Sequence, residues 1–203
     1  MPDVVSVSEA VAARFSARAF KADPVPGETV RAILEAASRS PSGGNLQPWR
    51  VHAIAGDVLA DFKARVAARL GSPDEAQYAV YPANLWDPFR TRRFQVGEDL
   101  YGALEIPRED KIGRLKQFAR NAEFFGAPVG LFFSIDRNLG PPQWSDLGMY
   151  MQTVMLLATE QGLATCAQEF WSAYGKLAAE FLGLPDDHMV FSGMALGLAD
   201  EAA

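Results

Sequence analysis

The stretch from Ser145 to Gly162 constrains this chain most, because it has the length of a helix but almost no polar face. Its apolar side chains would surround a helix instead of forming one stripe along it. They are Leu147, Met149, Met151, Val154, Met155, Leu156, Leu157 and Ala158. Such a helix must be buried on all sides. In a chain of 203 residues, we expect a second subunit to cover one of those sides.

The rest of the chain predicts further helices and a few short strands. Apolar residues at helical spacing predict helices near 6–15, 30–40, 57–70, 89–104, 108–124 and 174–182. Alternating or continuous apolar runs predict strands near 50–55, 128–135, 162–167 and 189–196. Because strands and helices do not alternate regularly, the pattern favours an α+β fold.

We expect one domain over residues 1–203, with an excursion at about 72–104. The first part of this excursion combines prolines with Tyr78, Tyr81 and Trp86. Linkers rarely carry so many aromatic residues, so the segment is predicted to be ordered. Ordered excursions often line a functional site.

Composition excludes several classes of protein. The net charge of -6 and the lack of a basic, aromatic-rich stretch disfavour nucleic-acid binding. The first ten residues have no positive charge and no apolar run reaches membrane-spanning length, which predicts a cytoplasmic protein. With Cys166 as the only cysteine and His52 far from His188, no metal site is expected. The motifs GxGxxG, GxxxxGK[ST], GxSxG and HExxH are absent.

Three local patterns could carry chemistry. In the first, Arg14-Phe-Ser-Ala-Arg18, an extended backbone would place Arg14, Ser16 and Arg18 on one side. Arginine suits phosphate because its planar guanidinium donates two hydrogen bonds at once. The alternative is that these are solvated residues just past a helix, where arginine is favoured by the helix dipole.

The second pattern is the loop from Pro41 to Trp49, in which two prolines and Gly43-Gly44 exclude regular structure. Its hydroxyl and amide side chains are those of Ser42, Asn45 and Gln47. The loop could therefore approach a flat ligand closely. Alternatively, it is a tight turn that leads into a strand and places Trp49 in the core.

The third pattern, Thr165-Cys-Ala-Gln-Glu169, follows the apolar helix and could present main-chain amides to a ligand. Cys166 could act as a redox thiol. No neighbouring Lys, Arg or His is evident that would lower its pKa, so a buried and unreactive cysteine is expected.

In their order and spacing, these patterns resemble the FMN-dependent nitroreductases, in particular the nitrobenzoate-reductase-like branch, over nearly the whole chain. The blocks that carry the resemblance are Arg14-Phe-Ser-Ala-Arg18, Ile33-Leu-Glu-Ala-Ala-Ser-Arg-Ser-Pro-Ser-Gly-Gly-Asn-Leu-Gln-Pro-Trp49, Phe125-Gly-Ala-Pro128, Asp136-Arg137, Gln143-Trp-Ser-Asp-Leu-Gly148 and Gly162-Leu-Ala-Thr-Cys-Ala-Gln-Glu169. The resemblance implies a central mixed sheet surrounded by helices. It also implies a homodimer in which FMN lies at the interface beside the long buried helix.

The resemblance further implies a role for each block. Arg14 and Ser16 would hold the FMN phosphate, and Arg18 would lie near the ribityl chain and the pyrimidine edge. Other flavin contacts would come from Pro41, Ser42, Gly43 and Asn45 of the second subunit and from the backbone of Ala167, Gln168 and Glu169 at N5. Asp146 would be either a polar flavin contact or the N-cap that opens the helix.

The implied reaction is ping-pong: NADPH or NADH reduces the flavin and leaves, and a nitroaromatic or similar electron-poor compound is reduced next. No side chain needs to act as a nucleophile, because the flavin carries the difficult chemistry. Tyr78, Tyr81, Trp86, Phe124 and Trp144 are candidates for stacking on the acceptor.

Several alternatives stay open at this stage. The same scaffold hosts enzymes that reduce quinones, enones or halogenated aromatics, so the resemblance does not determine the acceptor. A flavin-holding dimer with little turnover and a flavin-free interaction protein are further possibilities. Family members usually continue past the last strand with an arm that adds an Arg or Lys to the phosphate, and Leu198 to Ala203 offer no counterpart. Either the tail was lost, or Arg14 and Arg18 carry more of the phosphate charge.

Overall fold

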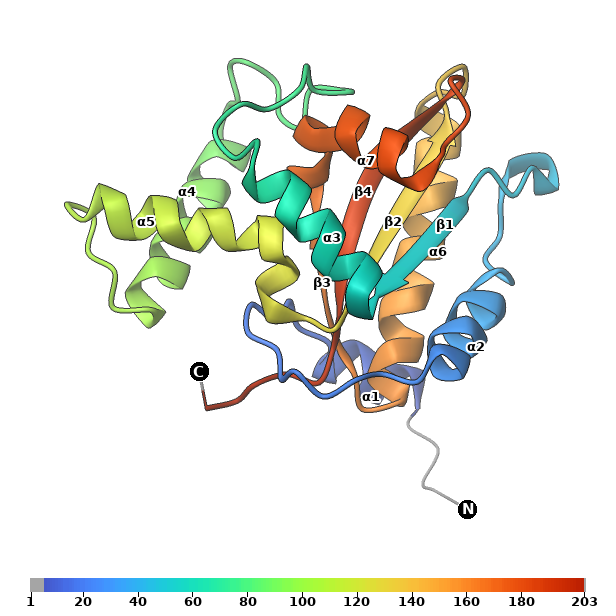
Figure 1. Ribbon diagram of the computed structural model, residues 1–203, viewed down its shortest axis with the longest axis horizontal. Helices are drawn as coiled ribbons and strands as arrows, with labels where there is room; N and C mark the ends of the chain where they lie inside the picture. Colours follow the sequence, from blue (N-terminus) through green and yellow to red (C-terminus); the bar gives the residue numbers. More distant parts are fainter. Residues whose placement is uncertain (1–5, 203) are drawn as a thin grey trace.

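A computed structural model describes residues 6–202. Residues 1–5, part of the start segment used to predict location, and Ala203 lie outside the described residues. In chain order the elements are α1 (Val7–Ala13), α2 (Gly27–Ala37), η1 (Gly43–Asn45), β1 (Arg50–Ala55), α3 (Gly56–Ala67), α4 (Phe89–Ala103), α5 (Lys111–Ala119), η2 (Arg120–Gly126), β2 (Val129–Asp136), α6 (Pro141–Glu160), β3 (Ala164–Gln168), η3 (Glu169–Tyr174), α7 (Gly175–Leu182) and β4 (His188–Gly197). Figure 1 shows the helices arranged around the sheet. The α+β prediction is therefore confirmed.

The sheet has the order β1-β2-β4-β3, and each neighbouring pair is antiparallel. The prediction of a mixed sheet is wrong for these strands. β2 and β3 run in the same direction and are joined through α6, but β4 inserts between them. The parallel pairing in the described part of the chain is an isolated bridge between Ser16 and Thr165.

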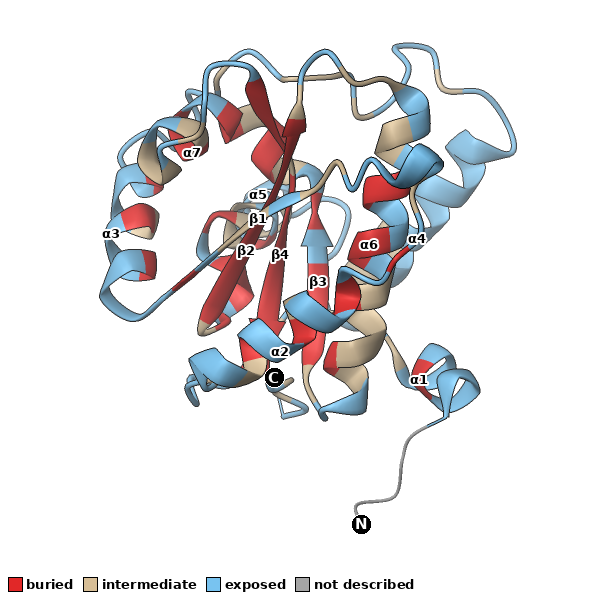
Figure 2. Ribbon diagram, turned by 90° about the vertical axis from the view of Figure 1, so that its right-hand side faces the viewer, coloured by how far each residue is buried: buried red, intermediate tan, exposed pale blue. Residues whose placement is uncertain are grey.

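Two apolar clusters cover the two faces of the sheet, as the red core of Figure 2 illustrates. Side chains on β2 alternate between them, because successive residues of a strand point to opposite faces. Phe132 packs with Phe62 of α3 on one face, while Leu131 packs with α2 and α6 on the other. The prediction that this strand is covered on both faces is confirmed, since its residues from Val129 to Ile135 are buried.

Local capping explains where several helices begin and end. Ser6 and Glu9 form the predicted capping box, with hydrogen bonds of 2.7 and 3.2 Å. The first helix ends at Ala13, two residues earlier than predicted, because Arg14 adopts an extended conformation. α6 begins at Pro141 instead of Ser145, since proline is well tolerated in a first turn, where its missing N–H would have no partner.

The first residues of the excursion are hydrogen-bonded to the rest of the domain, whereas the helices that follow are mostly exposed. The backbone N–H of Asp74 donates to the carbonyl of Ala173 at 2.8 Å, and its carboxylate accepts from the N–H of Leu177 at 3.0 Å. α4 contains no buried residue, and α5 buries only Gln117. These two helices project on the left of Figure 1. Among residues 6–202, no helix is both long and apolar enough to cross a bilayer.

Candidate functional site

The segment from Arg14 to Arg18 lies beside the edge strand β3. The N–H of Ala17 donates to the carbonyl of Thr165 at 3.0 Å, next to the bridge formed by Ser16. Ala17 is buried, whereas Ser16 and Arg18 are exposed and Arg14 is half-buried. Two of the three predicted patterns are therefore neighbours in the folded chain.

The two arginines of this segment have no carboxylate partner within residues 6–202. Arg18 donates only to the carbonyl of Ser16, at 3.3 Å, and Arg14 has no side-chain hydrogen bond to a described residue. Guanidinium groups left free beside a serine hydroxyl form a donor set suited to a phosphate. This donor set fits the phosphate of FMN.

At the end of β3, main-chain groups rather than the side chain of Gln168 are available to a ligand. Gln168 is 2% exposed, and its side chain is fully used by the core. Its amide donates to the carbonyl and to Oδ1 of Asn121, at 2.9 and 3.1 Å, and its Oε1 accepts from Nε1 of Trp171 at 3.2 Å. Strand alternation places the backbone of Ala167 on the same outer edge as that of Thr165. The side chain of Gln168 therefore holds this edge in place.

Electrostatics connect the base of the excursion to the same region. Desolvation raises the pKa of the Glu169 carboxyl. Burial, with a smaller contribution from the Glu169 charge, raises the pKa of Tyr78 to about 12. Tyr78 donates to the carbonyl of Phe191 at 2.5 Å and stacks on its ring, with centroids 5.2 Å apart. Tyr78 is therefore a neutral, fixed group near the end of β3.

The loop from Pro41 to Trp49 combines an anchor with a strained, exposed tip. Trp49 is partly buried and stacks on Tyr150, with centroids 4.9 Å apart, as the alternative interpretation of a turn that places this ring against the core expected. Asn45 and Gln47 have φ values of 56° and 48°, in the left-handed region that costs non-glycine residues energy. The N–H of Gln47 donates to Oγ of Ser42 at 3.0 Å. Strain held in this way is typical of binding loops.

Asp146 does not open its helix. Gly140 is the N-cap of α6, so both the opening position and the N-cap role proposed for Asp146 are wrong. Asp146 is 5% exposed, and its Oδ2 accepts from the N–H of Gly43 at 3.2 Å. Asp146 therefore attaches the strained loop to α6.

One chain does not bring all the predicted residues together. The loop that contains Gly43 is bound near the N-terminal end of α6, whereas the segment from Arg14 to Arg18, which pairs with the start of β3, lies near the other end of the helix. A helix of 20 residues is about 30 Å long. Figure 1 shows the two groups at opposite ends of this helix.

The aromatic residues considered for stacking on the acceptor differ in solvent exposure. Phe124 is fully buried among Phe62, Phe132 and Trp171, so it cannot stack on an acceptor. Trp144 and Tyr78 pack against Phe191, while Tyr81 and Trp86 are exposed on the excursion.

Another aromatic pair was missed from the sequence. Phe118 is exposed and lies edge-on to Phe170, with centroids 5.7 Å apart. In the sequence, the feature that could have pointed to this pair is that Phe170 directly follows the segment from Thr165 to Glu169.

Cys166 is 4% exposed, which confirms a buried thiol. Burial raises its pKa, although the charge of Arg18 acts in the opposite direction. The expectation that no cation acts on Cys166 is therefore wrong, but desolvation is the larger effect. A protonated thiol in this position does not favour redox chemistry.

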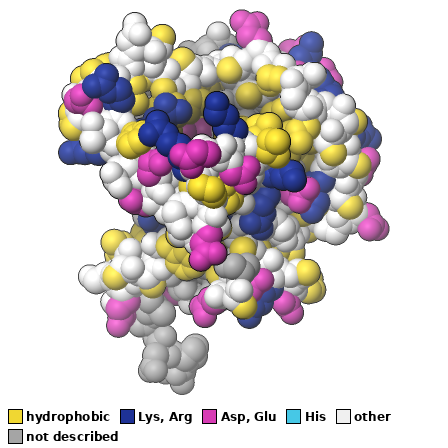
Figure 3. Space-filling view, turned by 90° about the vertical axis from the view of Figure 1, so that its left-hand side faces the viewer, with side chains coloured by type: hydrophobic (Ala, Val, Ile, Leu, Met, Phe, Trp, Pro, Cys, Tyr) yellow, Lys and Arg dark blue, Asp and Glu magenta, His cyan; other side chains and the backbone are white. Residues whose placement is uncertain are grey.

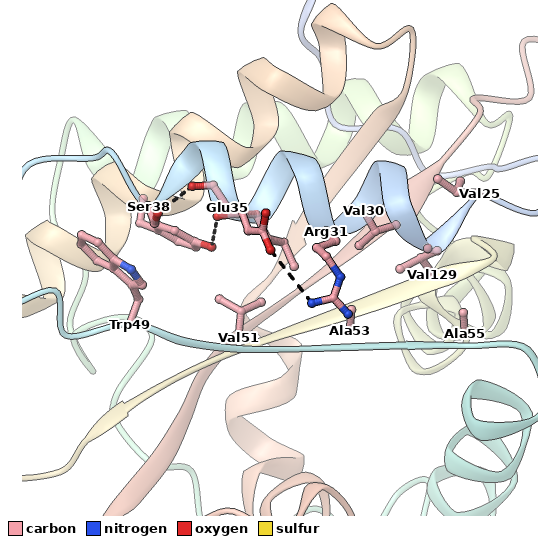
Figure 4. A pocket seen from close by; sticks show the side chains of 13 residues that line it. Val25, Val30, Arg31, Glu35, Ser38, Trp49, Val51, Ala53, Ala55 and Val129 are labelled. Carbon is pink, nitrogen blue, oxygen red and sulfur yellow. Dashed lines mark hydrogen bonds and ion pairs between the residues drawn. The ribbon is translucent and has the colours of Figure 1, made fainter.

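A separate groove of about 670 Å³ lies between α2 and β1. Figure 4 shows its apolar lining, with Val30 and Val51 on opposite sides and the Arg31–Glu35 pair, 4.0 Å apart, at one wall. None of the predicted site residues lines it. Within residues 6–202, no group of three His, Cys, Asp or Glu side chains could hold a metal ion.

Known proteins of one family match most of this chain. The family described as the nitroreductase family matches residues 11–198. The chain is 37% identical over 193 residues to a 4-nitrobenzoate reductase from Pseudomonas putida, covering 95% of this chain and 85% of that protein.

Two solved structures are also similar. An FMN- and NADPH-dependent nitroreductase, NfnB, from Sphigopyxis sp. strain HMH has a TM-score of 0.94 and 49% identity, over 98% of this chain and 90% of the other. The FMN-dependent NfnB from Mycobacterium smegmatis, in complex with NADPH, has a TM-score of 0.90 and 30% identity, over 98% and 91%. This chain belongs to the nitroreductase family, and its resemblance to the nitrobenzoate-reductase-like branch is confirmed.

Proposed function

We propose that this protein is an FMN-dependent oxidoreductase that uses NADPH or NADH in a ping-pong mechanism to reduce nitroaromatic or related electron-poor compounds. We further propose that residues 1–203 act as one domain with the excursion at about 72–104, and that the protein works in the cytoplasm. Family membership and the names of its relatives support the reaction class.

The proposal rests mainly on one observation: Arg14 and Arg18 have no carboxylate partner among residues 6–202, and their segment lies against the outer edge of β3. Arg14, Ser16 and Arg18 would hold the phosphate and the adjacent edge of the flavin. When bound, FMN supplies hydride acceptance and donation. The outer backbone of Ala167, with Gln168 and Glu169, would orient the ring, and the Arg18 charge would favour its anionic reduced form.

The second part of the site would come from a second copy of the chain. In this proposal Pro41, Ser42, Gly43 and Asn45 of each subunit contact the flavin held by the other, with Asp146 holding the loop through Gly43. Their distance from Arg14 in one chain supports this arrangement. The uncovered side of α6 supports it too, since it exposes the apolar side chain of Met149, which is 39% exposed. FMN would then be shared across a homodimer interface built around α6.

Replacing Met149 by lysine is expected to dissociate the dimer and to reduce FMN retention with it. A lysine placed at a subunit interface without a partner loses its hydration, so association becomes unfavourable. Gel filtration with light scattering would measure the mass. Met149→Leu, which keeps the apolar contact, should remain dimeric. A Met149→Lys protein that stays dimeric and yellow would place the interface elsewhere.

The proposal as a whole is tested by the visible spectrum of the purified protein after incubation with FMN and gel filtration. A flavin band should elute at the dimer position and should bleach when one equivalent of NADPH or NADH is added anaerobically. Addition of 4-nitrobenzoate should then restore the oxidised spectrum.

Three outcomes of this experiment would contradict the proposal at different points. Absence of bound flavin would refute the cofactor assignment. A flavin that nicotinamide cofactors do not bleach would leave a flavin-holding dimer. Reoxidation by a quinone but not by 4-nitrobenzoate would mean that the proposed class of acceptor is wrong.

A further inference from the structure

We propose that the cavity between residues 83–85 and α4 binds the adenosine 2′-phosphate end of NADPH, with Arg93 as the phosphate ligand. This inference rests on the proposed function and would make the protein selective for NADPH over NADH. Four observations support it: local charge, the pairing of the cavity residues, their distance from the end of β3, and an aromatic neighbour.

The segment 89–120, which contains α4 and α5, differs in charge from the chain as a whole. Residues 89–120 contain eight Lys and Arg against five Asp and Glu, whereas the whole chain contains 19 against 25. Figure 3, which looks onto this side, shows basic side chains gathered around a hollow together with acidic ones. A basic region on an acidic protein concentrates anionic ligands locally.

The cavity next to α4 has a volume of about 680 Å³. Its lining includes Asn84, Leu85, Arg90, Arg93, Phe94 and Glu98. Two of its charges are already neutralised, because Arg90 pairs with Asp87 and Glu98 pairs with Arg114 at 2.6 Å. Arg93 has no carboxylate partner within residues 6–202. It is therefore the cation left available in this cavity.

Arg93 is held by an aromatic ring. Its guanidinium lies over Tyr81, 4.3 Å from the ring centroid. Tyr81 is 47% exposed, so the pair forms a flat surface open to solvent. A guanidinium next to an aromatic ring suits both parts of the ligand, since purines stack on such surfaces and phosphate accepts the paired donors.

The cavity lies within reach of the end of β3. Gln77 donates its N–H to the carbonyl of Ser172 at 3.3 Å, and Tyr78 is close enough to Glu169 for that charge to affect its pKa. Tyr81 is three positions after Tyr78, which is at most about 10 Å of extended chain. A dinucleotide whose nicotinamide lies near Ala167 could therefore reach Arg93 with its other end.

NADH lacks the 2′-phosphate and therefore has no anionic group at this position for Arg93 to bind. In dinucleotide-binding proteins generally, a nearby arginine accommodates this phosphate. We expect Arg93→Gln to lower the ratio of kcat/KM for NADPH to that for NADH by about tenfold, which corresponds to about 1.4 kcal/mol. The loss should be mainly in KM for NADPH.

Arg92→Gln is the matched control. Arg92 precedes Arg93 on α4, is exposed and does not line the cavity. Removing it changes the net charge equally but should leave the NADPH to NADH ratio within about twofold of the wild type, because only distant screening changes. An equal fall of the ratio in both variants would reduce the effect to general charge and overturn the proposal.

A second measurement does not depend on turnover. Calorimetric titration of the full chain with adenosine 2′,5′-bisphosphate and with adenosine 5′-monophosphate should show tighter binding of the bisphosphate, and Arg93→Gln should abolish this difference. If the two nucleotides bind the wild type equally, the 2′-phosphate assignment is wrong even where flavin reduction proceeds. If the protein retains no flavin but discriminates the nucleotides through Arg93, the proposed reaction fails and this site stands.

Discussion

Replacing Arg14 and Arg18 together by glutamine is expected to raise the dissociation constant for FMN about a hundredfold or more. Each hydrogen bond to a charged group is worth roughly 1.5–3 kcal/mol, and about 1.4 kcal/mol corresponds to a factor of ten. The segment carries no competing ion pair among the described residues, so little of this energy would be recovered elsewhere. Quenching of FMN fluorescence on titration with the protein would measure the change.

A double variant of α3, Lys63→Gln with Arg65→Gln, provides the control. It removes the same total charge from exposed or half-exposed positions, where Arg65 pairs with Asp61 at 2.9 Å. Exposed pairs of this kind contribute little to stability. FMN affinity should therefore stay near the wild-type value. A comparable loss of FMN in the control would mean that net charge, and not the site, determines affinity.

Replacing Gln168 by leucine is expected to lower the free energy of unfolding by about 2–5 kcal/mol. The change leaves Nε1 of Trp171 and the carbonyl of Asn121 without their partners, and each buried unsatisfied group costs roughly 1–3 kcal/mol. FMN affinity should fall as well, because the same contacts hold the edge of β3. Urea unfolding followed by tryptophan fluorescence would give the stability.

Gln117→Leu is the matched comparison, because it makes the same substitution at another buried glutamine. Nε2 of Gln117 has no hydrogen-bond partner, and its Oε1 accepts only a long bond of 3.4 Å from Arg120. Removing an unsatisfied buried amide should cost less than about 1 kcal/mol or increase stability. Equal destabilisation by both variants would show that loss of side-chain shape, not of hydrogen bonds, dominates at Gln168.

Much of the fold could be predicted because the relevant information is local. The capping box of Ser6 and Glu9 is complete within four residues, and β1 begins and ends at the residues that the alternation predicted. The predicted strand through Val129 is buried on both faces because its side chains are apolar at every position but one or two. Periodicity and capping contain enough information for these elements.

The predictions that failed depend on contacts between distant residues. The insertion of β4 between β2 and β3 cannot be read from any one strand. The helix predicted over 108–124 ends at Ala119 and is followed by η2, in which the buried Phe124 and Phe125 take positive φ values. The buried position of Phe124 follows from that conformation. Tertiary packing overrode local preference at these places.

The candidate site likewise has some features that the sequence determines and others that only the tertiary structure determines. The sequence by itself determined which residues could bind a phosphate or approach a flat ring, because guanidinium, hydroxyl and flexible backbone groups have fixed chemistry. Only the tertiary structure brought Ser16 to Thr165, buried the side chain of Gln168 and placed the carboxylate of Asp146 on Gly43. Ser16 and Thr165, like Asp146 and Gly43, are more than a hundred residues apart, and Gln168 is 47 residues from Asn121. These contacts are set by how the helices pack on the sheet. Tertiary packing likewise put the loop containing Gly43 and the segment from Arg14 to Arg18 at opposite ends of α6, since one helix of that length keeps its ends apart.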